Sequence, residues 1–325
     1  RMRSLVALAA LATVALAFPT DPEPTPAIQS ETTAAAVSES PYAQYVGERQ
    51  YPLPFKTRIA ESFKLGQTIH AVGILKEKPV RVDFNFHKGN GELADIPLHV
   101  SIRFDEGFFS GWLVYNTFTD GNWSTIEQRV SNPFKPSEEF DLRVRILEGK
   151  FQIFGNRKDL GFFEMRKPLE GVDHVSIKGD LKSLSLFHYG GIINKENVYS
   201  AQAPLAPGRR LDVSGLPTGR RVDIGLFRAN KEYALQVSIR FDENAVVRNG
   251  MNNFVWGKEE REGGLPLKKG EIFDVTLVNE EFSVQILLNG KRYATFQHRG
   301  SPTDFVTMSV EGNVDIHSVT VNNAR

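Results

Sequence analysis

The sequence contains no cysteine and carries no net charge, because 39 Lys and Arg residues balance 39 Asp and Glu. Without cysteine there is no disulfide, no thiol nucleophile and no Cys-based zinc site, so stability must come from apolar cores. Without an excess of basic residues, nothing favours a nucleic-acid-binding surface. We therefore expect no nucleic acid partner and no Cys-bound zinc; no other metal and no cofactor is expected either. Neutral ligands such as sugars agree with this charge balance.

Long apolar runs are also scarce. One, RMRSLVALAALATVALA at residues 1–17, has basic residues, then an apolar stretch, then Ala-Leu-Ala. This order predicts a secretory signal peptide cleaved after Ala17, and the run is short for a membrane span; a buried N-terminal helix is the alternative. Residues 18–50 are rich in Pro, Thr and Ser and are predicted to form a disordered tail. We expect a secreted protein without a membrane span.

Helical periodicity is missing after residue 50, and short alternating runs take its place. Examples are RVDFNF (81–86), DLRVRI (141–146), FDVTLV (273–278) and FSVQIL (282–287). Alternation of apolar and polar residues predicts half-buried strands. Asn289-Gly290 between two such runs predicts a type I′ hairpin turn. The fold class is therefore all-β.

One octapeptide occurs twice in nearly identical form, as HVSIRFDE at 99–106 and QVSIRFDE at 236–243, 137 positions apart. The similarity continues in VYN (114–116) and VRN (247–249). Such a period indicates tandem domains, which we place at residues 51–193 and 196–325.

The octapeptide has two faces, because a strand sends alternate side chains to opposite sides. Its Val, Ile and Phe share the core face, and its first residue, Ser and Arg share the other. Further along the second copy comes WGKEER (256–261), with a Trp followed by Glu and Arg. An indole can cover the apolar face of a pyranose while Arg and Glu bind its hydroxyls. This combination favours a sugar-binding site.

These motifs resemble the galectin carbohydrate-recognition domain, whose pattern is H-x-N-x-R, V-x-N and W-x-x-E-x-R. The resemblance extends over 51–325 and includes FQHR at 296–299. It implies two concanavalin-like jelly-roll β-sandwiches that bind β-galactosides without metal and without catalysis, and a bivalent lectin for galactoside-containing glycans and glycoproteins.

The resemblance assigns sugar-binding roles residue by residue. In the first domain the positions are His99, Ser101, Arg103, Asn116, Trp123, Glu127 and Arg129. In the second domain they are Gln236, Ser238, Arg240, Asn249, Trp256, Glu259 and Arg261. His99 and Arg103 would bind the axial hydroxyl of galactose, Asn116 the primary hydroxyl, and Trp123 would stack on the ring.

Several positions depart from the pattern. Ser101 and Ser238 replace the motif Asn, and Gln236 replaces its His. WSTIEQR (123–129) has one residue too many before Glu127, which would displace Glu127 and Arg129. The first residue of the octapeptide, His99 in one copy and Gln236 in the other, lies on the ligand face. This difference indicates two sites of unequal preference.

Two other functions are open from the sequence. A galectin fold with lost or altered sugar specificity would act through protein contacts. A glycosidase would need a carboxyl group that acts as an acid, but Glu127 and Glu259 each precede an Arg by two residues, which favours the ionised form. Asn122-Trp123-Ser124 is an N-glycosylation sequon, and a glycan on Asn122 would block the first site.

Overall fold

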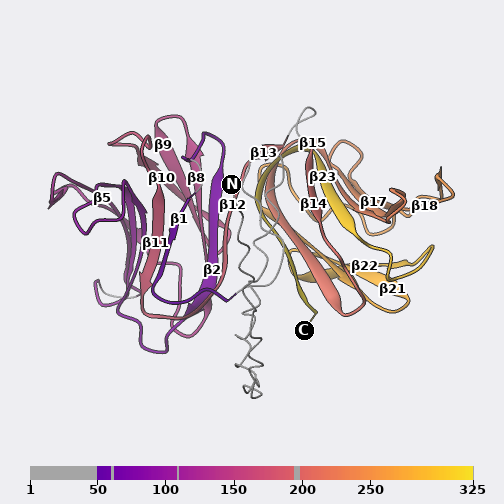
Figure 1. The fold of residues 1–325 in the computed structure, drawn as a ribbon, viewed down its shortest axis with the longest axis horizontal. Helices are drawn as coiled ribbons and strands as arrows, with labels where there is room; N and C mark the ends of the chain where they lie inside the picture. Colours follow the sequence, from indigo (N-terminus) through magenta and orange to yellow (C-terminus); the bar gives the residue numbers. More distant parts are fainter. Residues whose placement is uncertain (1–49, 60–61, 108–109, 194–197, 325) are drawn as a thin grey trace, which may run out of the picture. The chain divides into compact units, whose positions relative to one another are not determined.

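The computed structural model describes residues 50–59, 62–107, 110–193 and 198–324. Every regular element in these ranges is a β-strand, which confirms the all-β prediction (Figure 1). The predicted signal peptide and nearly all of the predicted tail lie outside the described residues. Within the described part, no helix is long and apolar enough to cross a membrane.

The first domain (indigo to magenta in Figure 1) is built from two antiparallel sheets. In order across the larger sheet, the strands are β1 (Phe55–Arg58), β11 (His174–Gly179), β3 (Arg81–His87), β4 (Ile96–Arg103), β5 (Trp112–Thr119) and β6 (Asn122–Trp123), and β7 (Gln128–Ser131) also pairs with β5. The smaller sheet has the order β10 (Lys158–Glu164), β9 (Lys150–Gly155), β8 (Glu139–Leu147), β2 (Thr68–Leu75) and β12 (Leu181–Gly190).

The second domain (orange to yellow in Figure 1) repeats this plan, and two of its strands, β15 and β23, are long. Its strands are β13 (Ile192–Ile193), β14 (Tyr199–Gln202), β15 (Arg209–Phe227), β16 (Tyr233–Arg240), β17 (Ala245–Asn249), β18 (Met251–Asn252), β19 (Val255–Trp256), β20 (Phe273–Asn279), β21 (Ser283–Leu288), β22 (Lys291–Gln297) and β23 (Thr307–Asn323). The first part of β15 pairs with β20 and its last part with β16, so β15 follows the path that the first domain divides between β2 and β3.

Each domain has its own apolar core between its two layers. Val100 and Ile102 of β4 pack in one core cluster with Val144 of β8. Val237 and Ile239 of β16 occupy the same role in a second cluster. The apolar face of the octapeptide is therefore buried in both copies, as its alternation predicts.

The four alternating runs fall in β3, β8, β20 and β21, which confirms those strand predictions. Asn289 and Gly290 both have positive φ (51° and 75°) and connect β21 to β22. Both angles are those of a type I′ turn, as predicted.

Candidate functional site

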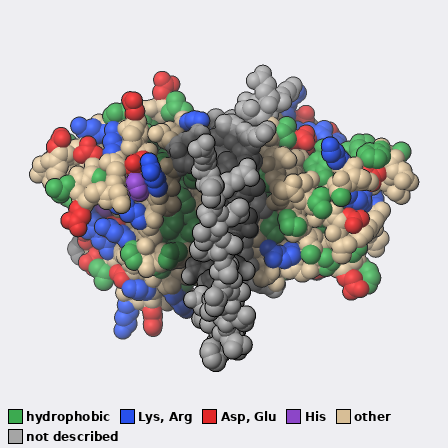
Figure 2. All heavy atoms as spheres, in the orientation of Figure 1, with side chains coloured by type: hydrophobic (Ala, Val, Ile, Leu, Met, Phe, Trp, Pro, Cys, Tyr) green, Lys and Arg blue, Asp and Glu red, His purple; other side chains and the backbone are tan. Residues whose placement is uncertain are grey.

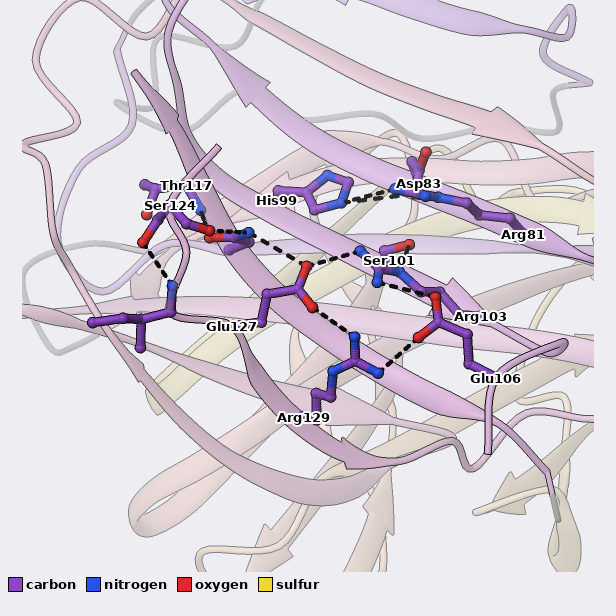
Figure 3. A network of polar contacts seen from close by, with 12 residues as sticks. Arg81, Asp83, His99, Ser101, Arg103, Glu106, Thr117, Ser124, Glu127 and Arg129 are labelled. Atoms are coloured by element: carbon purple, nitrogen blue, oxygen red, sulfur yellow. Dashed lines mark hydrogen bonds and ion pairs between the residues drawn. The ribbon is translucent and has the colours of Figure 1, made fainter. Parts of the chain in front are cut away.

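The register of neighbouring strands gathers polar side chains on the outer face of the larger sheet of the first domain. His99 of β4 lies opposite Asn116 of β5. Ser101 lies opposite Val114, which pairs on its other side with Arg129 of β7. Residues from three strands thus meet around β4 (Figure 3).

Four charged side chains of the first domain form a closed ring of ion pairs. Arg103 donates to Glu106 (3.2 Å) and to Glu127 (3.1 Å). Arg129 donates to the second oxygen of each carboxylate, at 2.7 Å in both cases. Figure 3 shows the two guanidinium groups alternating with the two carboxylates. Each group fixes its neighbours, so the ring holds a rigid set of donors and acceptors.

The second domain builds the same ring from the matching residues. Arg240 donates to Glu243 (3.3 Å) and to Glu259 (3.1 Å). Arg261 donates to Glu259 at 2.7 Å and also to Glu243. Hydrogen bonds from Arg261 are the largest influence lowering the pKa of Glu259 and Glu243. For Glu127, burial raises the pKa but hydrogen bonds from Arg129 and Arg103 outweigh it and lower the value.

The serine that replaces the motif Asn holds the central Arg in each domain. Arg103 Nε donates to Ser101 Oγ at 3.2 Å, and Arg240 Nε donates to Ser238 Oγ at 3.0 Å. Contacts among the described residues use three of the five N–H groups of Arg103. Two N–H groups are left for a ligand, on a guanidinium whose position is already fixed.

An Asn beside each ring of ion pairs is oriented by an Arg that is not part of the ring. Asn116 Nδ2 donates to Ser124 O (3.1 Å), and Arg166 donates to Asn116 Oδ1 (3.4 Å). In the second domain, Asn249 Nδ2 donates to Gly257 O (3.0 Å) and Arg299 donates to Asn249 Oδ1 (2.6 Å). These contacts fix the orientation of each side-chain amide, so that its N–H donors and its carbonyl acceptor have defined positions.

Each site includes an exposed indole. Trp123 is 46% exposed and contacts His99, with ring centroids 4.5 Å apart. Trp256 is 41% exposed and contacts Tyr233 at 5.0 Å. Such exposure is unusual for a Trp and leaves a flat apolar surface beside the polar ring.

The extra residue between Trp123 and Glu127 does not displace the ring. Glu127 bonds Arg103 and Arg129 at 3.1 and 2.7 Å, the same distances that join Glu259 to Arg240 and Arg261. The expected displacement is therefore wrong. The additional residue is accommodated in the exposed loop before Glu127, where Ile126 is 71% exposed.

His99 is fixed, whereas Gln236 is not. His99 Nδ1 lies 2.5 Å from Asn85 Oδ1, so Nδ1 is assigned the proton. Nε2 is then an acceptor, and Arg81 Nη2 lies 3.4 Å from it. Burial, and then the charges of Arg81 and Arg103, lower the pKa of His99 to about 4 despite Asp83. In the second domain Gly225 stands opposite Gln236, where Asn85 stands opposite His99. Among the described residues, no side chain bonds the Gln236 amide.

The comparisons with known proteins agree with this duplicated geometry. The model of the family "Galactoside-binding lectin" matches residues 54–188 and again 197–321. A 32 kDa beta-galactoside-binding lectin of Caenorhabditis elegans is 36% identical over 278 residues, covering 84% of this chain and 98% of the relative. A lectin with the same description from Haemonchus contortus is 36% identical over 282 residues, covering 84% and 96%. Galectin-4 of Sus scrofa is 26% identical over 312 residues, covering 83% and 95%.

The chain belongs to the galactoside-binding lectin family. It is a tandem-repeat member, since the family model matches it twice.

Five residues in this tandem galactoside-binding lectin, two matching pairs and Asn85, were not predicted as part of the sites. Glu106 and Glu243 close the two rings, Arg166 and Arg299 orient the Asn amides, and Asn85 holds His99. The first pair had a signal, since Glu is the last letter of the repeated octapeptide. The second pair ends the parallel stretches FEMR and FQHR. For Asn85 the repeat gave no signal, because Gly225 stands at the matching position of the second copy.

Asn122 of the lectin's first domain is exposed, in β6 immediately before Trp123. Its Nδ2 donates to Asp120 O at 2.9 Å. Because neighbours in a strand point to opposite faces, the Asn122 side chain points away from the face that carries the Trp123 indole. In the part of the chain that the structure describes, no cluster of three or more His, Asp or Glu is placed to hold a metal ion.

Proposed function

We propose that this chain is a bivalent, non-catalytic lectin for β-galactoside-containing glycans and glycoproteins. The supporting observation is the duplicated ring of two Arg and two Glu beside an exposed Trp and an oriented Asn. Free N–H groups of Arg103 and Arg240 would donate to sugar hydroxyls, and Glu127 and Glu259 would accept from them. Trp123 and Trp256 would stack on the apolar face of the ring.

The two sites would differ in how they recognise the sugar. In the first, the imidazole of His99 is held at a fixed position, and the axial hydroxyl of galactose would replace Arg81 as the donor to Nε2. In the second, Gln236 would first have to be ordered, which costs roughly 0.5–1.5 kcal/mol of side-chain entropy. We therefore propose that the first site is the more selective for galactose.

The carboxylates of the rings are acceptors rather than acids. Each is paired with two guanidinium groups, and the pKa of Glu127, Glu243 and Glu259 is lowered. A glycosidase needs one carboxyl that is protonated near neutral pH. The ionised pairs therefore support the non-catalytic function.

Two sites on one chain should cross-link surfaces that carry galactosides. We expect the full chain to aggregate lactose-coated particles, as measured by light scattering, and free lactose to reverse the aggregation. Trp123→Ala and Trp256→Ala should each still bind particles but no longer aggregate them. Aggregation that free lactose does not reverse would instead support the alternative function, a galectin fold that acts through protein contacts.

Residues 1–17 and the sequon lead us to propose secretion and a regulated first site. On the secreted protein, mass spectrometry should find an N-terminus at Phe18 and a glycan on Asn122. A glycan is large enough to reach from Asn122 past the edge strand β6 to the first site, where it would exclude ligand. A mature protein that retains residues 1–17, or that carries unmodified Asn122, would remove the corresponding proposal.

A further inference from the structure

The hairpin β18–β19 of the second domain ends in three consecutive exposed apolar side chains. Phe254 is 65% exposed, Val255 67% and Trp256 41%. Within the described ranges, this is the one run of three consecutive large hydrophobic residues that are all exposed. Apolar side chains that stay exposed bury no surface when the chain folds. A run of them therefore indicates a contact with another molecule. We call Phe254 and Val255 the apolar tip.

The turn that forms the apolar tip is strained. Asn253 and Phe254 have φ angles of 51° and 58°. A type I′ turn needs positive φ at both central residues, which Asn and Gly adopt easily and a bulky residue does not. The corresponding turn of the first domain, Asp120 and Gly121 with φ of 52° and 77°, has the favourable residues and is followed by Asn122 instead of Val255.

The strained turn is held from inside by a buried ion pair. Glu232 Oε1 accepts a hydrogen bond from the backbone N–H of Phe254 at 2.5 Å, and Arg228 donates to Met251 O at 3.0 Å. Arg228 and Glu232 contact each other at 3.5 Å, and their side chains are 9% and 7% exposed. This brace uses only backbone groups of the hairpin. A glycine at 254 would keep the brace and relieve the strain.

The apolar groups surround the end of the hairpin rather than line one side of it. Val255 and Trp256 are neighbours in a strand and point to opposite faces. Trp256 faces the sugar site, so the apolar surface that the sugar leaves uncovered is that of Phe254 at the turn and Val255 on the opposite face. A fluid apolar phase that the hairpin enters end-on would cover both. Exposed Lys231 and Lys258 lie close to the tip in the sequence. The acids that follow Lys258, Glu259 and Glu260, are paired with Arg side chains. Figure 2 shows hydrophobic side chains gathered near charged ones at the end of the second domain where Figure 1 labels β18.

We propose that the apolar tip enters the headgroup boundary of a lipid bilayer while Trp256 stacks on the sugar of a galactose-bearing glycolipid in that bilayer. Aromatic and aliphatic side chains flanked by Lys are suited to this boundary, where apolar atoms leave water and ammonium groups meet phosphates. The inference rests on the proposed function, since the same hairpin supplies Trp256 to the second sugar site. The first domain, with Gly121 and Asn122, would bind soluble and bilayer-held sugars alike.

The test uses the full chain carrying Trp123→Ala, so that only the second site binds. Its affinity is measured for free lactose and for phosphatidylcholine vesicles with and without lactosylceramide. The variant Phe254→Gly with Val255→Asn places the first domain's residues at the tip. Phe282→Gly, at a residue that is 76% exposed before β21, is the matched control.

We expect the tip variant to bind lactosylceramide vesicles at least ~10-fold more weakly. Its lactose affinity should stay within about twofold and its melting temperature should not fall, while Phe282→Gly changes neither affinity. Unchanged vesicle binding with intact lactose binding would overturn the membrane contact alone. An equal loss for lactose and vesicles would assign the tip to the sugar site, and a concentration-dependent dimer abolished by the tip variant would assign it to a second copy. Either result overturns the proposal. Absence of lactose binding in the parent would instead refute the proposed function.

Discussion

Replacing Arg103 or Arg240 with Lys is expected to reduce lactose affinity at the altered site by about 100-fold or more. Each Arg contacts a Ser and two Glu at once and still offers free N–H groups. Lys keeps the charge but has a single ammonium, so it cannot satisfy both carboxylates and a ligand in this planar arrangement. Hydrogen bonds to charged groups contribute about 1.5–3 kcal/mol each, and the loss of more than one gives this factor.

The matched control is Arg58→Lys, at an exposed position of β1 in the same sheet of the first domain. It should change the affinity by less than about twofold, because it alters no ring contact. Titration calorimetry of the full chain measures all three variants. If Arg103→Lys and Arg240→Lys bind as well as Arg58→Lys, the rings are structural features and not parts of a sugar site.

Acid is expected to destabilise the first domain through His99. The pKa of folded His99 is about 4 and the ordinary pKa of a histidine is 6.5, so the unfolded chain takes up the proton first as the pH falls. The contribution of neutral His99 is therefore fully present above pH 6.5 and is lost progressively down to about pH 4. The difference in pKa corresponds to about 3 kcal/mol of unfolding free energy.

His99→Gln, which copies Gln236, removes this titration and serves as the comparison. Urea unfolding at several pH values should show a steeper loss of stability between pH 6.5 and 4 in the wild type than in His99→Gln. Lactose binding by the first site should persist at pH 5.5, because the imidazole of His99 in the folded protein is still neutral and its Nε2 is still a hydrogen-bond acceptor. Parallel stability curves for the two proteins would contradict the assigned burial and bonding of His99.

The two faces of the octapeptide were predictable, because alternation alone separates Ile239 from Arg240. The closing carboxylates were harder to recognise, since Glu106 and Glu243 reach the ring only after the chain turns past the strand end. Both residues end the repeated octapeptide, but the repeat by itself did not indicate what they contact. The bond between Asn85 and His99 depends on the register of β3 against β4, which no local pattern encodes.

Two local features went against sequence expectations for physical reasons. The extra residue before Glu127 has no effect on the ring because an exposed loop absorbs it and two Arg side chains anchor the carboxylate. The turn at Asn253-Phe254 has Phe where Gly is usual, and buried Glu232 binds its backbone. In both cases contacts made by distant residues override the local preference.

The most direct test of the two-site account is calorimetric titration of lactose into the full chain. The account predicts binding to two sites of unequal affinity. Trp123→Ala and Trp256→Ala should each leave one site, and the double variant none. No heat at millimolar lactose, or two sites that survive both Trp substitutions, would contradict it.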